Sequence, residues 1–343
     1  MKKLLNTLYV STQGAYLYHE GEAIVVRLEN EEKLRVPIHL INGLVCFGNV
    51  AISSSLLGLC GERGVAVSLL TEHGRFLARV QTQVSGNVLL RRKQYRLADQ
   101  AADRVDLARG FVLGKLANAR TVLQRASRDH GDKGGVEALV QASNQLSYLI
   151  EAARQEPDID ALRGIEGRGA RAYFEVFDHM ITTQKDTFFL YCRSRRPPLD
   201  NLNALLSFIY TLVVHDAEAA LEAVGLDPQV GYLHAERPGR PSLALDLIEE
   251  FRPVFADRLA LSLVNLRQVQ PDGFKTSESG GIIMDDETRK VVLVNYQKRK
   301  EDEITHRFLE EVVPIGLLLH VQALLLSRFI RGDLDAYPPF LWK

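Results

Sequence analysis

Residues 89–129 read LLRRKQYRLADQAADRVDLARGFVLGKLANARTVLQRASRD, and the character of the chain changes at this point. The stretch is rich in Ala, Leu, Arg and Gln, and its apolar residues recur at helical spacing. After a Gly-rich loop at 131–135, the segment VEALVQASNQLSYLIEAAR (136–154) resumes the pattern. It continues toward the C-terminus, with interruptions at 193–200, 237–242 and 270–304. The last interruption is predicted to be a small β-hairpin or an ordered loop inserted among helices.

The residues before 90 have the opposite character. Segments such as AYLYHE (15–20), EAIVVRLE (22–29) and LRVPI (34–38) contain β-branched and aromatic residues, either in alternation with polar residues or in continuous runs. Both patterns are typical of strands. SSSLLGLCGERG (53–64) instead predicts a short helix that begins after a serine cap and ends at glycines. We therefore expect an α+β fold with an N-terminal β-rich domain at 1–92 and a larger, mostly α-helical domain at 93–343.

The bulk composition is that of an ordinary globular protein. The chain has 343 residues, 46% of them hydrophobic, and its formal net charge is −1, so any nucleic-acid surface must be a local basic patch. Its three cysteines, Cys46, Cys60 and Cys192, contain no C-x-x-C pair and indicate reduced thiols in a cytoplasmic protein. Residues 315–330 are apolar but too short to cross a membrane comfortably, and they predict a buried C-terminal helix rather than a membrane anchor.

A group of acidic residues follows a proline- and glycine-containing loop in LHAERPGRPSLALDLIEEFRPVFADR (233–258). Ser242 is a plausible helix N-cap, and the carboxylates of Asp246 and Glu249 would share one face of that helix. Glu250, four residues after Asp246, is a competing candidate for the pair. A divalent metal would compensate acids beside a buried face, and the loop could return His234 to the start of the helix.

The ordinary interpretation of the same residues is a solvated helix face. Acidic side chains on helices usually lie near Arg or Lys, and Arg252 and Arg258 are available here. Glu166 lies between Gly164 and Gly167 ahead of a helical pattern, where a carboxylate is often merely favourable to the helix dipole. Spacing alone therefore does not decide between a metal site and a surface.

Basic residues gather in RSRRPPLDNLNALLSFIYTLV (193–213). Arg193, Arg195 and Arg196 precede a predicted helix and are suited to phosphate, although most small arginine clusters are only solvated. Tyr191 and Tyr210 flank the cluster and could stack on bases. Two further clusters are weaker signals: Arg91, Arg92, Lys93 and Arg96 around Tyr95, and Lys298, Arg299 and Lys300.

Four motifs in order carry a family resemblance. They are GIEG at 164–167 with Tyr173-Phe174, NALLSFIY at 203–210, GYLH at 231–234 and SLALDLIEEFRP at 242–253. Together they resemble the CRISPR-associated spacer-integration endonucleases, the universal integrases of CRISPR adaptation, and most of all the type I, subtype C form. The resemblance covers nearly the whole chain.

The resemblance implies how the two domains are used and which residues act. The β-rich domain at 1–92 would serve in dimerisation, and the helical domain at 93–343 would be catalytic. A Mg²⁺- or Mn²⁺-dependent site would be formed by Glu166, His234 and Asp246. A further acidic position, often Asp in the family, falls on Glu249. The residues expected to contact DNA are Arg193, Arg195, Arg196, Tyr173 and Tyr210.

The implied activity is a metal-dependent DNA endonuclease and integrase. A 3′-hydroxyl would attack a phosphodiester and so insert short DNA fragments into a CRISPR array, on double-stranded and branched DNA. The implied partners are a second copy of the chain and a small companion adaptation protein, and recruitment of an end-trimming nuclease is left open. The alternatives are a stand-alone structure-specific nuclease acting on branched DNA in repair, and a non-catalytic DNA-binding scaffold.

Overall fold

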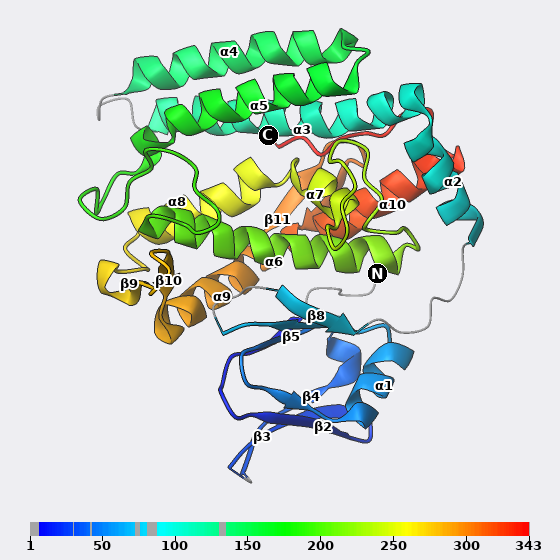
Figure 1. The fold of residues 1–343 in the computed structure, drawn as a ribbon, viewed down its shortest axis with the longest axis vertical. Helices are drawn as coiled ribbons and strands as arrows, with labels where there is room; N and C mark the ends of the chain where they lie inside the picture. Colours follow the sequence, from blue (N-terminus) through cyan, green and yellow to red (C-terminus); the bar gives the residue numbers. More distant parts are fainter. Residues whose placement is uncertain are drawn as a thin grey trace. The chain divides into compact units, whose positions relative to one another are not determined.

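The computed structural model describes residues 7–29, 31–41, 43–72, 76–80, 88–129 and 135–342 (Figure 1). The chain forms two compact units. The first comprises Met1–Gly86, Asp286–Glu303 and Pro314–Leu317, and the second comprises Asn87–Asp285, Ile304–Val313 and Leu318–Lys343. The strand-rich beginning and the mostly helical remainder confirm the predicted α+β fold.

The first unit contains two four-stranded sheets with helix α1 beside them (Figure 1). One sheet has the order β1-β5-β7-β8, in which β1, β5 and β7 are parallel and β8 is antiparallel to β7. The other has the order β4-β3-β2-β6. The bounds are β1 Thr7–Val10, β2 Tyr16–Glu20, β3 Ala23–Leu28, β4 Glu31–Pro37, β5 Gly43–Phe47, β6 Ala51–Ile52, α1 Ser54–Glu62, β7 Ala66–Leu70 and β8 Phe76–Val80.

The residue pattern of each strand matches its place in the sheets. Strand β5 is paired on both edges by parallel strands, and its Leu44–Phe47 run is buried throughout, as a central parallel strand requires. Strand β4 lies at an edge and is charged and exposed, which discourages pairing with other chains. The predicted short helix is confirmed as α1, whose cap Ser53 accepts a hydrogen bond from the Leu56 amide.

Helix α9 (Asp286–Glu301) belongs to the first unit and corrects a prediction. We expected a hairpin or loop over 270–304, and only β9 (Phe274–Thr276) and β10 (Ile282–Met284) form a hairpin there. The β-branched run VVLV favoured strand, but Val292, Leu293 and Tyr296 are buried on one side of a helix. Acids in its first turn and bases in its last turn suit the helix dipole.

The second unit is built around long helices (Figure 1). Their bounds are α2 Val88–Asp99, α3 Ala101–Asp129, α4 Val136–Gln155, α5 Ile159–Glu175, α6 Asn201–Ala223, α7 Ser242–Ile248, α8 Arg258–Asn265 and α10 Leu318–Arg331. A π-helical turn, Arg252–Asp257, precedes α8, and the short strands β11 (Glu303–His306) and β12 (Glu311–Pro314) pair ahead of α10. Helices α3, α4 and α5 pack against one another.

Two apolar helices form much of the interior of this unit. Helix α6 is long and apolar enough to cross a membrane by length and composition, yet 72% of its apolar window is buried inside the structure. It is therefore a core helix. Helix α10 confirms the buried C-terminal helix predicted at 315–330, with Leu318, Leu326 and Ile330 among its buried residues.

Candidate active site

Helix α5 carries Glu166 in its middle. We expected Glu166 at a helix entry, but α5 begins at Ile159, where the Asp158 carboxylate caps it by accepting from the Ala161 amide at 2.7 Å. The glycines that suggested a boundary lie inside the helix. A third glycine of this helix, Gly169, permits close packing, because a Cβ there would overlap Leu116 of α3. This close approach brings Glu166 within reach of α3.

Helix α7 buries Asp246, whose carboxylate binds the loop that precedes it. The backbone amides of Tyr232 and Leu233 donate to Oδ2 at 2.6 and 3.0 Å, and the His234 amide donates to Oδ1 at 2.9 Å. Gly231 makes this possible, because a Cβ there would lie 2.6 Å from the Cβ of Ser242. Ser242 is the first residue of α7 rather than its N-cap.

The carbonyl groups of the same loop are held from two other helices. Arg104 of α3 donates to the Tyr232 carbonyl at 2.9 Å, and Arg163 of α5 donates to the Leu233 carbonyl at 2.6 Å. The amides of the loop thus bind the Asp246 carboxylate, and its carbonyls bind the guanidinium groups of Arg104 and Arg163. The loop that presents His234 is therefore fixed in position.

The imidazole of His234 is oriented by the same carboxylate. Its Nδ1 lies 2.7 Å from Asp246 Oδ1, and because a carboxylate only accepts, Nδ1 carries the proton in the neutral ring. The Nε2 lone pair is therefore not used by Asp246, and Nε2 lies 3.8 Å from Glu249 Oε1. The side chain of His234 is 23% exposed, whereas that of Asp246 is fully buried. His234 can therefore offer Nε2 as a ligand or a proton acceptor.

Lys115 of α3 lies between two acids from different elements. Its ammonium donates a hydrogen bond to Glu166 Oε1 and lies 2.7 Å from Glu249 Oε2. On its other side, Glu249 Oε1 is 3.2 Å from Arg252 Nη1. Burial would raise the pKa of Glu249, but the charges of Arg252 and then Lys115 outweigh it and lower that pKa to about 2. Glu249 is therefore a carboxylate at neutral pH.

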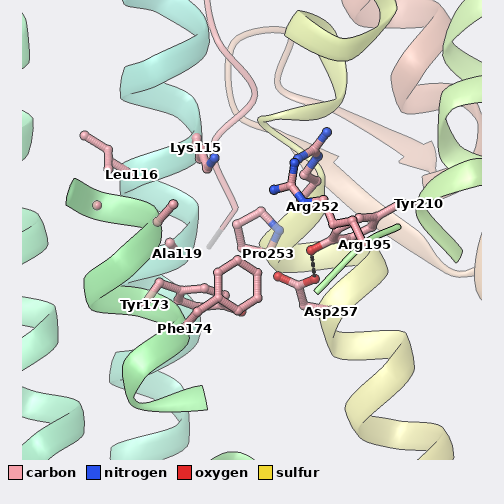
Figure 2. Close-up of a pocket in the computed structure, with 12 residues that line it drawn as sticks. Lys115, Leu116, Ala119, Tyr173, Phe174, Arg195, Tyr210, Arg252, Pro253 and Asp257 are labelled. Carbon is pink, nitrogen blue, oxygen red and sulfur yellow. Dashed lines mark hydrogen bonds between the residues drawn. The ribbon is translucent and has the colours of Figure 1, made fainter. Parts of the chain in front are cut away.

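A pocket adjoins these residues and contains a buried acid (Figure 2). Lys115, Arg195 and Arg252 line it together with Tyr173, Tyr210 and Asp257. The Tyr210 hydroxyl donates to Asp257 Oδ1 at 2.5 Å. Burial raises the pKa of Asp257 to about 6, although the tyrosine and nearby arginines oppose that change.

The residues expected to contact DNA differ in their exposure. Tyr173 is 3% exposed and Tyr210 9% exposed, so both are mostly packed inside the unit. Arg193 donates to Asn203 Oδ1 at 2.5 Å and to Ser207 Oγ at 3.1 Å, and its guanidinium lies over the Tyr210 ring.

Arg195 and Arg196 are exposed. They are the members of the set that are open to a large ligand.

Glu250 points into a second, separate environment. Its side-chain oxygens accept from the Tyr337 hydroxyl at 2.8 Å, the Phe340 amide at 2.7 Å and Gln322 Nε2 at 3.1 Å. Asn118 of α3 donates to the carbonyls of Glu250 and Phe340 at 2.7 and 2.8 Å. Glu250 is therefore a structural residue that docks the segment 337–342, and it does not form the acid pair with Asp246 that remained an alternative.

The sequence interpretation missed Lys115 and the use made of Arg252. Lys115 is the only charged residue in FVLGKLANA (111–119), where seven of the nine residues are buried. A single lysine on the apolar face of a helix needs a charge partner, and that was the available signal. In the sequence, Arg252 was considered only as an ion-pair partner for acids on a solvated helix face.

Comparisons with known proteins agree on one family. The model of the family "CRISPR associated protein Cas1" matches residues 8–298. The chain is 53% identical to CRISPR-associated endonuclease Cas1 1 of Chlorobaculum tepidum and 50% identical to CRISPR-associated endonuclease Cas1 2 of Rhodospirillum rubrum, each over the full length of both chains. It is also 34% identical to a Cas4 exonuclease/Cas1 endonuclease fusion of Geobacter sulfurreducens, covering 98% of this chain and 60% of the fusion.

Solved structures share the fold. A Cas1 protein from Thermotoga maritima superposes with a TM-score of 0.81 at 23% identity, covering 97% of this chain and 99% of that one. A casposase bound to its integration product gives 0.82 at 18% identity, with coverages of 98% and 94%. A Cas6–reverse transcriptase–Cas1–Cas2 complex gives 0.83 at 20% identity, covering all of this chain and 36% of that one. With the matched family model and the full-length relatives, the chain belongs to the CRISPR-associated protein Cas1 family.

Proposed function

We propose that this chain is a divalent-metal-dependent DNA endonuclease and integrase that inserts short DNA fragments into a CRISPR array. The observation that carries the proposal is the arrangement of Asp246, His234 and Glu249. The buried carboxylate of Asp246 fixes the ring of His234, and the free Nε2 of that ring faces Glu249. Family membership among endonucleases supports the same activity.

The residues present fit a divalent metal. Within the described part of the chain, no three His, Cys, Asp or Glu side chains already converge as a metal-binding group. However, the carboxylates of Glu166 and Glu249 already hold a cation, the ammonium of Lys115. Two carboxylates and one imidazole suit Mg²⁺ or Mn²⁺.

We assign the metal to Glu166, His234 Nε2 and Glu249. The resemblance implies Asp246 as a direct ligand, but its four contacts to the loop and to His234 support an orienting role beside the metal instead. Glu249 has a longer side chain than the Asp usual at this family position, and its contact with Lys115 and its 3.8 Å distance to His234 Nε2 support its assignment as a ligand.

The proposed reaction is a transesterification. A 3′-hydroxyl attacks a phosphodiester of the target, a new P–O bond forms and the original P–O bond breaks, so no nucleotide cofactor is consumed. When bound, the metal would neutralise charge on the phosphate and lower the pKa of the attacking hydroxyl. Asp246 keeps His234 in one orientation, and the exposed Arg195 and Arg196 contact the DNA backbone. Tyr173 and Tyr210 line the same pocket as Arg195, and Arg193 lies over the Tyr210 ring, so we propose that these three residues hold the arginines in place.

The proposed partners follow from the relatives. One structural neighbour is a complex that contains both Cas1 and Cas2, which supports a small companion protein of that kind here. The Cas4–Cas1 fusion supports recruitment of an end-trimming nuclease. We further propose that the β-rich domain at 1–92 mediates homodimerisation, that the helical domain at 93–343 is catalytic, and that the protein works in the cytoplasm on double-stranded and branched DNA.

The deciding experiment is an integration assay. A short duplex with 3′-hydroxyl ends and a supercoiled plasmid carrying a CRISPR repeat are incubated with Mg²⁺ or Mn²⁺, with and without the companion protein. We expect joined products that require the metal and the 3′-hydroxyl. Cleavage of branched DNA without joined product under any condition would instead indicate a stand-alone repair nuclease.

A further inference from the structure

Lys115 is a mostly buried lysine that contacts two acids at once. Its side chain is 11% exposed, and it joins Glu166 of α5 to Glu249, which directly follows α7. Lysine is almost never buried unless it is paired, and here it is paired twice. The ammonium thus holds together two acids that would otherwise repel each other.

The charges around these acids are already balanced. The carboxylates of Glu166 and Glu249 contribute two negative charges, and Lys115 and Arg252 contribute two positive charges in contact with them. A divalent ion placed on the same carboxylates would leave an excess of positive charge. That excess disfavours the ion unless the ammonium moves away or an anion arrives.

The pocket beside Lys115 gives its ammonium another place to lie. Lys115 lines that pocket with Arg195 and Arg252, and Figure 2 shows Lys115 and Arg252 approaching it from different elements. Lysine has a flexible four-carbon stem, so its ammonium can shift while the helix stays fixed. A pocket with three cationic residues on its wall suits a phosphate group.

We infer that Lys115 is an internal counter-ion of the two acids and that it makes metal binding depend on DNA. This inference rests on the proposed function. Without DNA, the ammonium competes with the metal for Glu166 and Glu249. A DNA phosphate draws the ammonium away and supplies the missing negative charge, so DNA and metal each tighten the binding of the other by the same factor.

The test is a Mn²⁺ titration followed by electron paramagnetic resonance. The native protein is measured alone and with a short duplex ending in 3′-dideoxy nucleotides, which cannot be joined. We expect the duplex to tighten Mn²⁺ binding at least about tenfold. In Lys115→Met, we expect tighter Mn²⁺ binding without DNA, again at least about tenfold, and a smaller effect of the duplex. Equal Mn²⁺ affinity of the native protein with and without duplex overturns the inference.

Three further variants separate the explanations. Lys115→Gln removes the charge but keeps hydrogen-bonding capacity, so it replaces the Met variant if that protein fails to fold. Arg252→Gln removes one positive charge that contacts only Glu249 of the pair, and we expect a smaller gain in affinity than at Lys115. Equal gains at both positions overturn the bridging role of Lys115.

Glu249→Gln distinguishes failure of the inference from failure of the proposed function. If the native protein binds no Mn²⁺ under any condition, the metal centre itself is wrong. If the native protein binds Mn²⁺ and Glu249→Gln does not, the centre stands, and unchanged affinity in both Lys115 variants overturns the inference alone.

Discussion

Glu249 and Glu250 are consecutive, fully buried acids with opposite properties. Glu249 faces Lys115 and Arg252, and their charges lower its pKa to about 2. Glu250 faces neutral donors from Gln322, Tyr337 and the Phe340 amide, and burial raises its pKa to about 8 despite those hydrogen bonds. One acid is therefore charged at neutral pH and the other is mostly protonated.

The difference teaches that burial does not decide the charge of a carboxyl group. Desolvation acts on both residues in the same direction, and only the neighbouring cations distinguish them. The charged acid faces the candidate metal centre, whereas the protonated acid docks the segment 337–342. Two consecutive residues between α7 and the π-helical turn thus face a candidate metal site on one side and a structural contact on the other.

The largest expected effect comes from Glu249→Gln. Loss of a ligand carboxylate should reduce metal-dependent DNA joining by at least about a thousandfold, within the range measured when a catalytic group is removed. Glu250→Gln is the matched control, because an amide can take the place of the protonated carboxyl, and it should retain joining. Comparable losses in both variants in the integration assay would contradict the division of roles.

The pH dependence of stability sharpens the contrast. Glu250 has a folded pKa of about 8 against an ordinary value of 4.5, so its contribution to stability is complete below pH 4.5 and is lost as the pH rises through 8. Between pH 5 and 8 the loss is on the order of 4 kcal/mol, at about 1.4 kcal/mol per pKa unit. Glu249 acts oppositely, since its contribution is lost only as the pH falls from 4.5 through 2.

Urea unfolding of the native protein and of Glu250→Gln between pH 5 and 8 measures this loss. The gap between their free energies of unfolding should shift in favour of the variant as the pH rises. Parallel curves over this range would show that Glu250 carries no unusual proton.

Asp246→Asn tests the third buried acid. An amide cannot accept from three backbone amides and the His234 ring as the carboxylate does, so the ring loses its fixed orientation. We expect Mn²⁺ binding to weaken about 10–100-fold, as for other residues that orient a metal ligand. Asp129→Asn, a surface change on α3, is the control and should leave the affinity unchanged. A native Mn²⁺ affinity in Asp246→Asn would remove the orienting role.

Tyr210→Phe should have the smallest effect. It removes the hydrogen bond to buried Asp257, and we expect a loss of about 1–3 kcal/mol in unfolding free energy. Tyr148→Phe, at a side chain that is 74% exposed, provides the comparison and should change stability little. Equal stability of the two variants would mean that the Asp257 contact contributes nothing measurable.

Local patterns predicted the fold class and the main helices of this chain, because apolar spacing reports directly on helices and strands. The pattern failed at α9, where β-branched residues outweighed the charges that mark both ends of the helix. His234 and Asp246 were linked by a short loop in the sequence, so their proximity could be anticipated. Lys115 lies 51 residues from Glu166 and still further from Glu249, and only the packing of α3 against α5, α7 and the π-helical turn brings the three residues together.

The ammonium of Lys115 also has a consequence for how the protein matures. Many metal proteins acquire a stable fold only with their ion, because the unneutralised ligands repel one another. Here the chain supplies its own positive charge to Glu166 and Glu249. We therefore expect newly synthesised protein to fold without any metal supply and to keep its melting temperature in the presence of a chelator, so that metal availability governs its activity and not its abundance.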